Sequence, residues 1–230
     1  MNDAATVAER LADTRARIEA AGGGPEVAIL AVTKAFGPEV VDIAVAAGCR
    51  AIGENYAQEL VSKRDTIAAH PGLGVHFIGQ LQTNKVRQLA GLVTVYETVD
   101  RVKLAREIAK RAPGAAIMVQ VDTSALTGDE AEGKGGCPIA DLDALVDSIG
   151  SLDLDLHGLM TVGPTEGGPA AARPGFVAVR AAVDRLGLSE CSMGMSGDLE
   201  VAVECGSTQV RVGTALFGSR PVPVWRDQER

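Results

Sequence analysis

The chain has 230 residues, of which 46% are hydrophobic, so it can bury a sizeable core in one large domain or two small ones. A formal net charge of −8, few aromatic residues and no Lys/Arg run argue against a nucleic-acid surface, and no apolar run approaches the length of a membrane span. The four cysteines lack CxxC spacing, which is typical of free thiols in a reducing cytoplasm. We therefore expect a cytoplasmic protein that binds neither nucleic acid nor membranes.

An amphipathic helix is predicted at the start of the chain, where the pattern differs from that of a signal peptide. One face of this helix carries four residues at helical spacing: Val7, Leu11, Thr14 and Ile18. The run Gly22–Gly24 then ends the helix.

Short apolar runs alternate with helix-like stretches along the rest of the chain. The expected strands are eight runs: VAILAVT, RAIG, VHFIG, LVTVYET, AAIMVQVD, LDLHGLMTV, ECSMGM and TQVRVG. The expected helices follow them one by one, over residues 38–47, 55–69, 83–90, 100–111, 138–149, 170–186, 197–205 and a short piece from Thr214.

Eight strand–helix units predict an α/β fold, a single (β/α)8 TIM-type barrel with an extra N-terminal helix. About 205 residues follow that helix, or roughly 26 per unit, which is near the low end for this fold. An open, doubly wound sheet is the alternative, because one miscounted strand would convert one picture into the other. The stretch GPTEGGPAAARPG is expected to form a long loop after the sixth strand. No linker rich in Pro, Gly or Ser divides the chain, so we expect residues 1–230 to form one domain.

Polar residues collect at the ends of the predicted strands, where a barrel of this kind places its chemistry. Lys34 follows six apolar residues and Thr33, and burying an ammonium group is costly. Other strand ends carry Gly53–Tyr56, His76, Asp122, His157, Met195–Gly197 and Arg211–Thr214. Each residue alone also has a structural explanation, such as a rim lysine, a core histidine or a helix cap. Their combination favours a binding site.

Two late strand-to-helix junctions, GMSGDLE and RVGTALFG, predict a phosphate site. They contain Ser196, Gly213 and Thr214, and helix N-termini after the seventh and eighth strands of a barrel often bind phosphate. Lys34 lies across the barrel mouth from them, where a partly desolvated amine can form a Schiff base with a phosphorylated aldehyde. Pyridoxal phosphate and the sugar phosphate of a class I aldolase both fit this pattern.

Three segments closely resemble the pyridoxal phosphate homeostasis proteins of the YggS/PROSC family: AVTKAFGPEVVDIAVAAGCRAIGENYAQEL, HFIGQLQTNK and SMGMSGDLEVAVECGSTQVRVGTALFG. The likeness runs from about Ala28 to Gly218. It implies a single-domain barrel of the alanine-racemase N-terminal type that carries pyridoxal 5'-phosphate on a lysine. The implied role is intracellular vitamin B6 homeostasis, with pyridoxal-phosphate-dependent client enzymes as partners.

The family's motifs imply roles for individual residues. By match to these motifs, Lys34 carries the cofactor as a covalent aldimine, and Arg211 faces its pyridine nitrogen. Ser196 binds the phosphate together with a second loop that contains Gly213 and Thr214. Pocket-lining positions are implied for two residues of the GENY and HFIG motifs, Asn55 and His76.

The sequence departs from the family pattern in two places. Leu199 stands where the family usually has Met, a volume-conserving change that we expect to be silent. The segment VDTSALTGDEAEGKGGC is longer and more acidic than the common form, so the role of the family's lysine in this segment is not carried over to Lys134.

A racemase of the alanine-racemase type is the main alternative to a cofactor carrier. Racemisation needs a second base on the opposite face of the cofactor, which alanine racemases take from a separate domain of a partner subunit. The chain ends at Arg230, soon after the eighth unit, and neither Tyr56 nor Tyr96 is expected over the cofactor. An aldolase would need a carboxylate beside the lysine, for which Glu54 is the candidate. We therefore expect a monomeric carrier rather than an enzyme.

Overall fold

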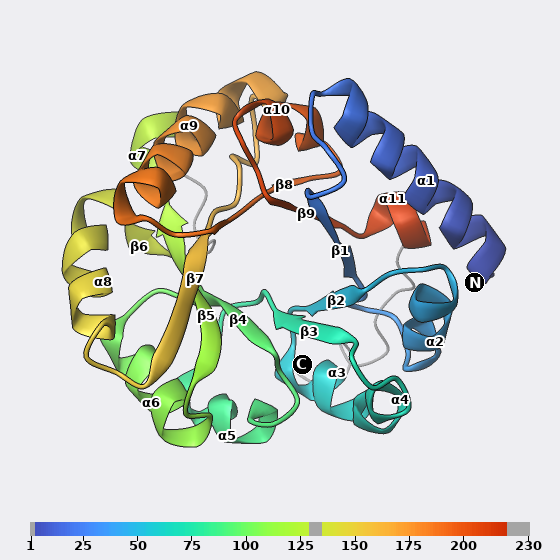
Figure 1. Ribbon diagram of the computed structural model, residues 1–230, viewed down its shortest axis with the longest axis horizontal. Coiled ribbons are helices and arrows are strands. Elements are labelled where there is room, and N and C mark those ends of the chain that lie inside the picture. Colours follow the sequence, from blue (N-terminus) through green and yellow to red (C-terminus); the bar gives the residue numbers. More distant parts are fainter. Residues whose placement is uncertain (1–2, 129–134, 220–230) are drawn as a thin grey trace, which may run out of the picture.

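Eight parallel strands close into a barrel in the computed structural model, which describes residues 3–128 and 135–219 (Figure 1). The barrel strands are β1 (Ala28–Val32), β2 (Ala51–Glu54), β3 (Gly74–Phe77), β4 (Val95–Val99), β5 (Ala115–Asp122), β7 (Leu154–Met160), β8 (Glu190–Met195) and β9 (Gln209–Val212). Their order is β4-β3-β2-β1-β9-β8-β7-β5, and the pairing of β4 with β5 closes the ring. A strand of two residues, β6 (Cys137–Pro138), pairs with β5.

Helices surround the barrel and follow the strands in turn (Figure 1). The α-helices are α1 (Ala4–Ala20), α2 (Glu39–Ala46), α3 (Ala57–Ser62), α4 (Arg64–Ala68), α5 (Val86–Leu89), α6 (Val102–Arg111), α7 (Ser124–Thr127), α8 (Leu142–Ile149), α9 (Gly168–Leu186), α10 (Leu199–Glu204) and α11 (Thr214–Phe217). Two 3₁₀ turns, η1 (Thr83–Lys85) and η2 (Ile139–Asp141), precede α5 and α8. None of the helices in the described part of the chain combines the length and the apolar character needed to cross a bilayer.

The predicted (β/α)8 TIM-type barrel with an extra N-terminal helix is confirmed, and the doubly wound sheet is excluded because β4 pairs with β5. Each predicted apolar run overlaps one barrel strand. Two details differ from the prediction. The helix expected over residues 55–69 is divided at Lys63, whose side chain turns toward a buried partner. The expected long loop is short, because α9 starts at Gly168, directly after Gly167 in the left-handed conformation (φ 83°).

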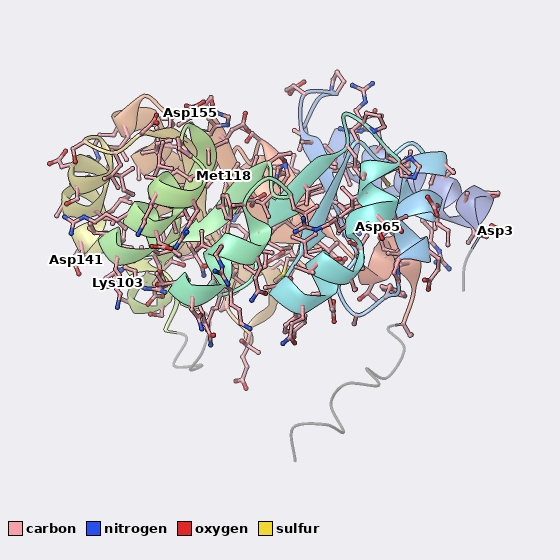
Figure 2. The ribbon with its side chains drawn as sticks, turned by 90° about the horizontal axis from the view of Figure 1, so that it is seen from below. Asp3, Asp65, Lys103, Met118, Asp141 and Asp155 are labelled. Atoms are coloured by element: carbon pink, nitrogen blue, oxygen red, sulfur yellow. The ribbon has the colours of Figure 1, made fainter. Side chains whose placement is uncertain are left out.

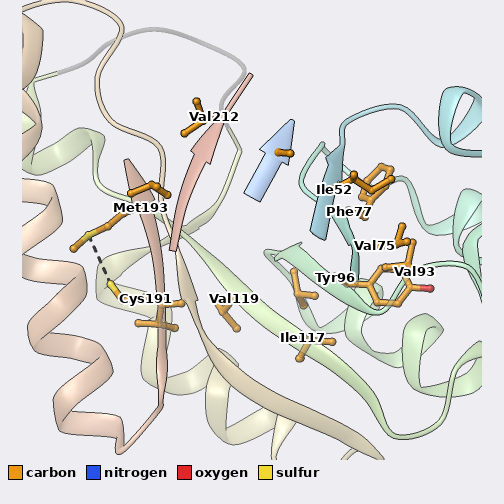
Figure 3. Close-up of a cluster of buried hydrophobic side chains, with 14 of the residues drawn as sticks. Ile52, Val75, Phe77, Val93, Tyr96, Ile117, Val119, Cys191, Met193 and Val212 are labelled. Carbon is orange, nitrogen blue, oxygen red and sulfur yellow. Dashed lines mark hydrogen bonds between the residues drawn. The ribbon is translucent and has the colours of Figure 1, made fainter. Parts of the chain in front are cut away.

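A layer of apolar side chains between the strands and the helices forms the hydrophobic core (Figure 3). Successive residues of a strand point to opposite faces of the barrel wall. Ile52, Phe77 and Tyr96 lie on the outer face and are buried there, whereas His76 and Glu97 bond to each other inside the barrel. The outer layer therefore supplies the apolar core, and part of the barrel interior is left to polar groups.

The four cysteines are free thiols, as predicted, and all are buried. Cys191 lies in the outer apolar layer, with its Sγ 3.6 Å from the Sδ of Met193 (Figure 3). Burial raises the pKa of Cys49 to about 11 and that of Cys191 to about 12. Because the thiolate is the nucleophilic form, these two side chains are unreactive at neutral pH.

The N-terminal helix α1 lies outside the barrel, against α2, α10 and α11 (Figure 1). Its predicted apolar face is the face that it buries, with Val7 and Ile18 fully buried. Two of its arginines reach the last two units of the barrel: the Arg10 guanidinium donates to the Leu216 carbonyl (2.9 Å), and that of Arg17 donates to the Ser196 carbonyl (3.0 Å). Helix α1 therefore fastens the segments that follow β8 and β9.

Candidate functional site

The carboxyl ends of the barrel strands surround a cavity of about 410 Å³, a size that suits a small-molecule ligand. Six of the seven residues singled out by the sequence line it: Lys34, Asn55, Ser196, Arg211, Gly213 and Thr214. The seventh, His76, is not among the described residues of the lining. It lies in β3, two residues before Ile78, which does line the cavity. Lys134 and its predicted loop segment 129–134 lie outside the described residues.

Lys34 reaches the cavity through strand alternation. Val32 ends β1 and lines the cavity, so the side chain two residues later points to the same side of the wall. The next residue, Ala35, has φ 67° and is the one non-glycine residue of the described chain with a positive φ. This left-handed conformation costs a residue with a Cβ about 1–2 kcal/mol. The Ala35 N–H donates to the Glu59 carboxylate (2.8 Å), which helps to hold the turn after Lys34.

A buried ion pair supports the strand end that carries Lys34. Glu54 and Lys63 are both fully buried and in direct contact, and we call them, with Thr33, the outer cluster. The Lys63 ammonium also donates to the Thr33 carbonyl (2.8 Å), and the Thr33 hydroxyl donates to Glu54 (2.6 Å). Burial raises the pKa of the Glu54 carboxyl, although Lys63 and Thr33 act in the opposite direction. Thr33, the residue just before Lys34, is therefore held by two hydrogen bonds, one that its carbonyl accepts from Lys63 and one that its hydroxyl donates to Glu54.

The outer cluster lies on the helix-facing side of the barrel wall. Gly53 and Asn55 alternate with Glu54 along the chain, and Asn55 lines the cavity. Glu54 is not among the described lining residues; it bonds to Lys63, which directly follows α3. The carboxylate that an aldolase would need beside Lys34 is therefore turned away from the cavity.

Two loops bring hydroxyl groups to the cavity, those of Ser196 after β8 and Thr214 after β9. The sequence predicted a helix start at residue 197, directly after Ser196. The structure places it at Leu199 with Asp198 as the N-cap residue, and Asp198 Oδ1 accepts from the Met195 N–H (2.6 Å). Ser196 therefore does not cap the helix. The helices are short, six residues in α10 and four in α11, so local hydroxyl and N–H donors matter more than a helix dipole.

Arg211 lines the cavity while its guanidinium is tied to the barrel interior. Its Nη1 donates to the carbonyl (2.8 Å) and the hydroxyl (2.9 Å) of Ser192, and its Nη2 donates to the Thr161 carbonyl (2.7 Å). Only 4% of the residue is exposed. Burial lowers the pKa of Arg211 from its ordinary value, and the negative charges of Glu97 and Asp198 oppose that effect.

A polar network inside the barrel continues from Arg211. We call its five members the inner cluster: His76, Glu97, Ser192, Gln209 and Arg211. The Glu97 carboxylate accepts from the Ser192 hydroxyl (2.7 Å) and from Gln209 Nε2 (2.8 Å), and it lies 2.5 Å from His76 Nδ1. Burial acts to raise the pKa of Glu97, but the His76 hydrogen bond and the charges of His76 and Arg211 outweigh it, so the pKa is lowered. His76 therefore belongs to this network, beneath the cavity.

The lining suits an anionic ligand with a reactive carbonyl group. Lys34 and Arg211 are the charged side chains among the described lining residues, and both are positive. Asn55 Oδ1 is buried without a hydrogen-bond partner in the described chain, so a donor on the ligand would satisfy it. The approach of Gly79 to Asn55 requires glycine, because a Cβ there would lie 1.9 Å from the Asn55 carbonyl oxygen. These groups fit the phosphate, aldehyde and hydroxyl of pyridoxal phosphate.

Several lining residues were not foreseen from the sequence, in particular Gln80, Gln120, Met160 and Val162. A signal was available for two of them: Gln80 directly follows the predicted strand VHFIG, and Gln120 is a polar residue near the end of the predicted strand AAIMVQVD.

Other strand-end candidates have structural roles. Asp122 Oδ1 accepts from the Ser124 N–H (2.9 Å) at the start of α7, and His157 lies within β7, where it bonds to Asp155 (2.7 Å). Neither tyrosine belongs to the described lining. Tyr96 is buried in the outer apolar layer, and Tyr56 lines a neighbouring groove.

Comparison with known proteins gives close matches over nearly the whole chain. The model of the alanine racemase N-terminal domain family matches residues 4–221. A pyridoxal phosphate homeostasis protein of Pseudomonas aeruginosa is 40% identical over 223 residues, which cover 94% of this chain and 96% of that protein. One of Escherichia coli K12 is 37% identical over 242 residues, with 96% and 98% covered.

Solved structures agree with these matches. PipY of Synechococcus elongatus PCC7942, solved with PLP bound, is 32% identical, with a TM-score of 0.81 over 92% of this chain and 100% of that chain. An alanine racemase of Clostridium difficile 630 has a TM-score of 0.71 at 16% identity, over 96% of this chain and 59% of that chain. At such identity the second likeness concerns the fold alone.

Proposed function

Because the chain belongs to the alanine racemase N-terminal domain family, and within it to the pyridoxal phosphate homeostasis proteins, we propose that it binds pyridoxal 5'-phosphate in the cavity at the carboxyl ends of its strands. The protein carries the cofactor as a Schiff base on Lys34. It serves vitamin B6 homeostasis in the cytoplasm as a monomer of one domain, with pyridoxal-phosphate-dependent enzymes as clients.

One observation carries the proposal: a lysine amine, a guanidinium and two hydroxyls line a single cavity with no carboxylate among its described residues. The neutral amine of Lys34 would hold the cofactor by condensing with its aldehyde group, with loss of water. The hydroxyls of Ser196 and Thr214, with the backbone N–H groups of their loops, bind the phosphate through charge-assisted hydrogen bonds. Arg211 donates to the pyridine nitrogen. Its charge disfavours protonation of that nitrogen, which makes the ring a weaker electron sink.

A carrier role fits this cavity better than racemisation does. A racemase of the alanine-racemase type needs a second base on the face of the cofactor opposite the lysine. The described lining residues include no Tyr, His, Cys, Asp or Glu, so Lys34 is the one side chain among them that can act as a base near neutral pH.

Replacing Lys34 tests the proposal. Purified protein is incubated with pyridoxal phosphate, reduced with borohydride and digested, and the modified lysine is identified by mass spectrometry. In the wild type we expect an imine absorption band and reduction on Lys34. In Lys34→Ala we expect the band to be lost with the fold retained, because a lysine at the cavity wall contributes little to the core.

Lys85→Ala is the matched control, since Lys85 lines the neighbouring groove and not the cavity. This variant should keep the imine band. An undiminished band in Lys34→Ala, or reduction on Lys63, Lys85 or Lys134, would overturn the assignment. Equal affinity for pyridoxal and pyridoxal phosphate would place the phosphate site elsewhere.

A further inference from the structure

Glu97 is a fully buried carboxylate that does not line the cavity, yet the inner cluster connects it to a residue that does. We propose that Glu97 is a positioning residue: it is the counter-charge of Arg211 and holds the guanidinium in its cavity-facing place through the Ser192 hydroxyl. This inference rests on the proposed function, because the group that Arg211 meets in the cavity is the ring nitrogen of the cofactor.

The hydrogen bonds give Ser192 a fixed direction. An ionised carboxylate only accepts, so the Ser192 hydroxyl must donate to Glu97 Oε2 across 2.7 Å. The lone pairs of the same oxygen then face Arg211 Nη1, 2.9 Å away. Gln209 Nε2 bonds to both Glu97 (2.8 Å) and the Ser192 hydroxyl (3.0 Å), which keeps the two groups together. Without Glu97 the hydroxyl can rotate, and one bond to the guanidinium is lost.

The charges lead to the same conclusion. A guanidinium that is almost completely buried needs a nearby negative charge, because desolvation of an unpaired cation is costly. Glu97 and Asp198 are the carboxylates among the described residues whose charges act on Arg211. Asp198 Oδ1 accepts from the Met195 N–H at the start of α10. Glu97 is the acid that is linked to the Arg211 guanidinium by a single bridging hydroxyl.

The bridge has a functional advantage over direct contact. An Arg–carboxylate pair in direct contact would place the negative charge directly against the guanidinium. Here the carboxylate lies beyond Ser192, so Arg211 lines the cavity while Glu97 acts on its guanidinium through the bridging hydroxyl. Glu97 therefore sharpens the preference of the cavity for a ring nitrogen over a ring C–H.

The test compares the affinity for pyridoxal phosphate with that for its 1-deaza analogue, in which a C–H replaces the ring nitrogen. In the wild type we expect the ratio of the two affinities to be about tenfold or more, as for a hydrogen bond from a charged donor. In Glu97→Gln, and in Ser192→Ala, we expect the ratio to fall to about threefold or less. Ser192→Ala breaks the same link without removing the charge, so it decides the question if Glu97→Gln does not fold.

Glu54→Gln is the matched control, since Glu54 is equally buried but lies on the other side of the barrel wall. This variant should leave the affinity ratio at the wild-type value even if both affinities fall. A ratio that stays at the wild-type value in Glu97→Gln and Ser192→Ala would overturn the proposal, because a merely structural role weakens both ligands equally.

The ligand-free protein separates this inference from the proposed function. Arg211→Met, Glu97→Gln and the double variant are unfolded in urea without cofactor. If Glu97 is the counter-charge of Arg211, the double variant loses less stability than the sum of the two single losses. Strictly additive losses would overturn the inference. Failure of the wild type to bind pyridoxal phosphate would instead overturn the proposed function and leave this comparison intact.

Discussion

The barrel wall separates two buried charge clusters, the outer cluster and the inner cluster. Each provides a buried cation with a carboxylate as its counter-charge, but in a different arrangement. In the outer cluster the Lys63 ammonium and the Glu54 carboxylate touch, and a backbone carbonyl and a hydroxyl complete the set. In the inner cluster the Arg211 guanidinium and the Glu97 carboxylate are separated by the Ser192 hydroxyl. The four charged residues of these two pairs are almost completely removed from solvent.

The difference shows how a buried cation is used for support or for recognition. In the outer cluster, direct contact with Glu54 balances the charge of Lys63, so this charge does not act on the cavity. The bond from Lys63 to the Thr33 carbonyl fixes the strand end before Lys34. The bridged arrangement holds Arg211 but leaves its cavity-facing edge able to meet a ligand. The outer cluster therefore positions a backbone segment, and the inner cluster positions a side chain.

The largest effect is expected from breaking the outer pair. Lys63→Met leaves Glu54 buried without its cation, and loss of one partner of a buried pair costs about 3–5 kcal/mol. The free energy of unfolding, measured with urea, should fall by that amount. Lys103→Met is the matched control, because Lys103 is exposed on α6 (Figure 2), and it should change stability by no more than about 0.5 kcal/mol. A loss below about 1 kcal/mol in Lys63→Met would show that the pair does not support the strand end.

A smaller effect, of opposite sign in the two clusters, is expected from pH. The pKa of Glu97 is lowered from 4.5, so Glu97 contributes stability above that pH, which is lost as the pH falls through the lowered pKa. The pKa of Glu54 is raised from 4.5, so its ionisation opposes folding as the pH rises through the raised pKa. Between about pH 3.5 and about pH 5.5, the stability loss in Glu97→Gln should therefore grow with pH and that in Glu54→Gln should shrink.

Urea titrations of the wild type and both variants across this pH range measure the two slopes. The difference between variant and wild type at each pH removes the contribution of the other titrating groups. Two slopes of the same sign would contradict the assignment of opposite pKa shifts to the two clusters.

The smallest effect is expected at the residue after Lys34. Ala35→Gly removes about 1–2 kcal/mol of left-handed strain but adds about 0.4–1 kcal/mol of chain entropy to the unfolded state. We expect a net gain of about 0.5 kcal/mol in the free energy of unfolding. Ala16→Gly, at an exposed helical position of α1, should instead cost about 0.5–1 kcal/mol. Equal losses in the two variants would show that Ala35 carries no strain.

Most of the fold could be predicted because the barrel strands are short apolar runs that alternate with amphipathic stretches. The two-residue strand β6 and the short helix α7 were missed, since neither is long enough to show a period. The division of α3 from α4 at Lys63 was also missed. A lysine within a helical stretch normally faces solvent, and only the tertiary structure shows that this one pairs with Glu54.

The site could be predicted where its residues follow strand ends, as Lys34 and Ser196 do, or lie close to one, as Arg211 does near the end of β9. Glu97 could not, because it lies inside the apolar run LVTVYET and its partners Ser192 and Gln209 are distant in sequence. Strand alternation places Glu97 on one face of its strand, but it does not tell which face looks into the barrel. The face of the strand that points into the barrel depends on how strands distant in sequence pair with one another. That pairing is fixed only when the barrel closes.

The arginines of α1 make the order of synthesis matter. Arg10 and Arg17 leave the ribosome well before their partners Leu216 and Ser196, which lie 206 and 179 residues further along the chain. Contacts of such sequence separation form late, because the loop that they close must first be drawn together. The two cavity loops that they fasten therefore gain their final form only after Ser196 and Leu216 have been synthesised. A nascent or truncated chain would display the lysine-bearing strand long before it could retain a phosphate.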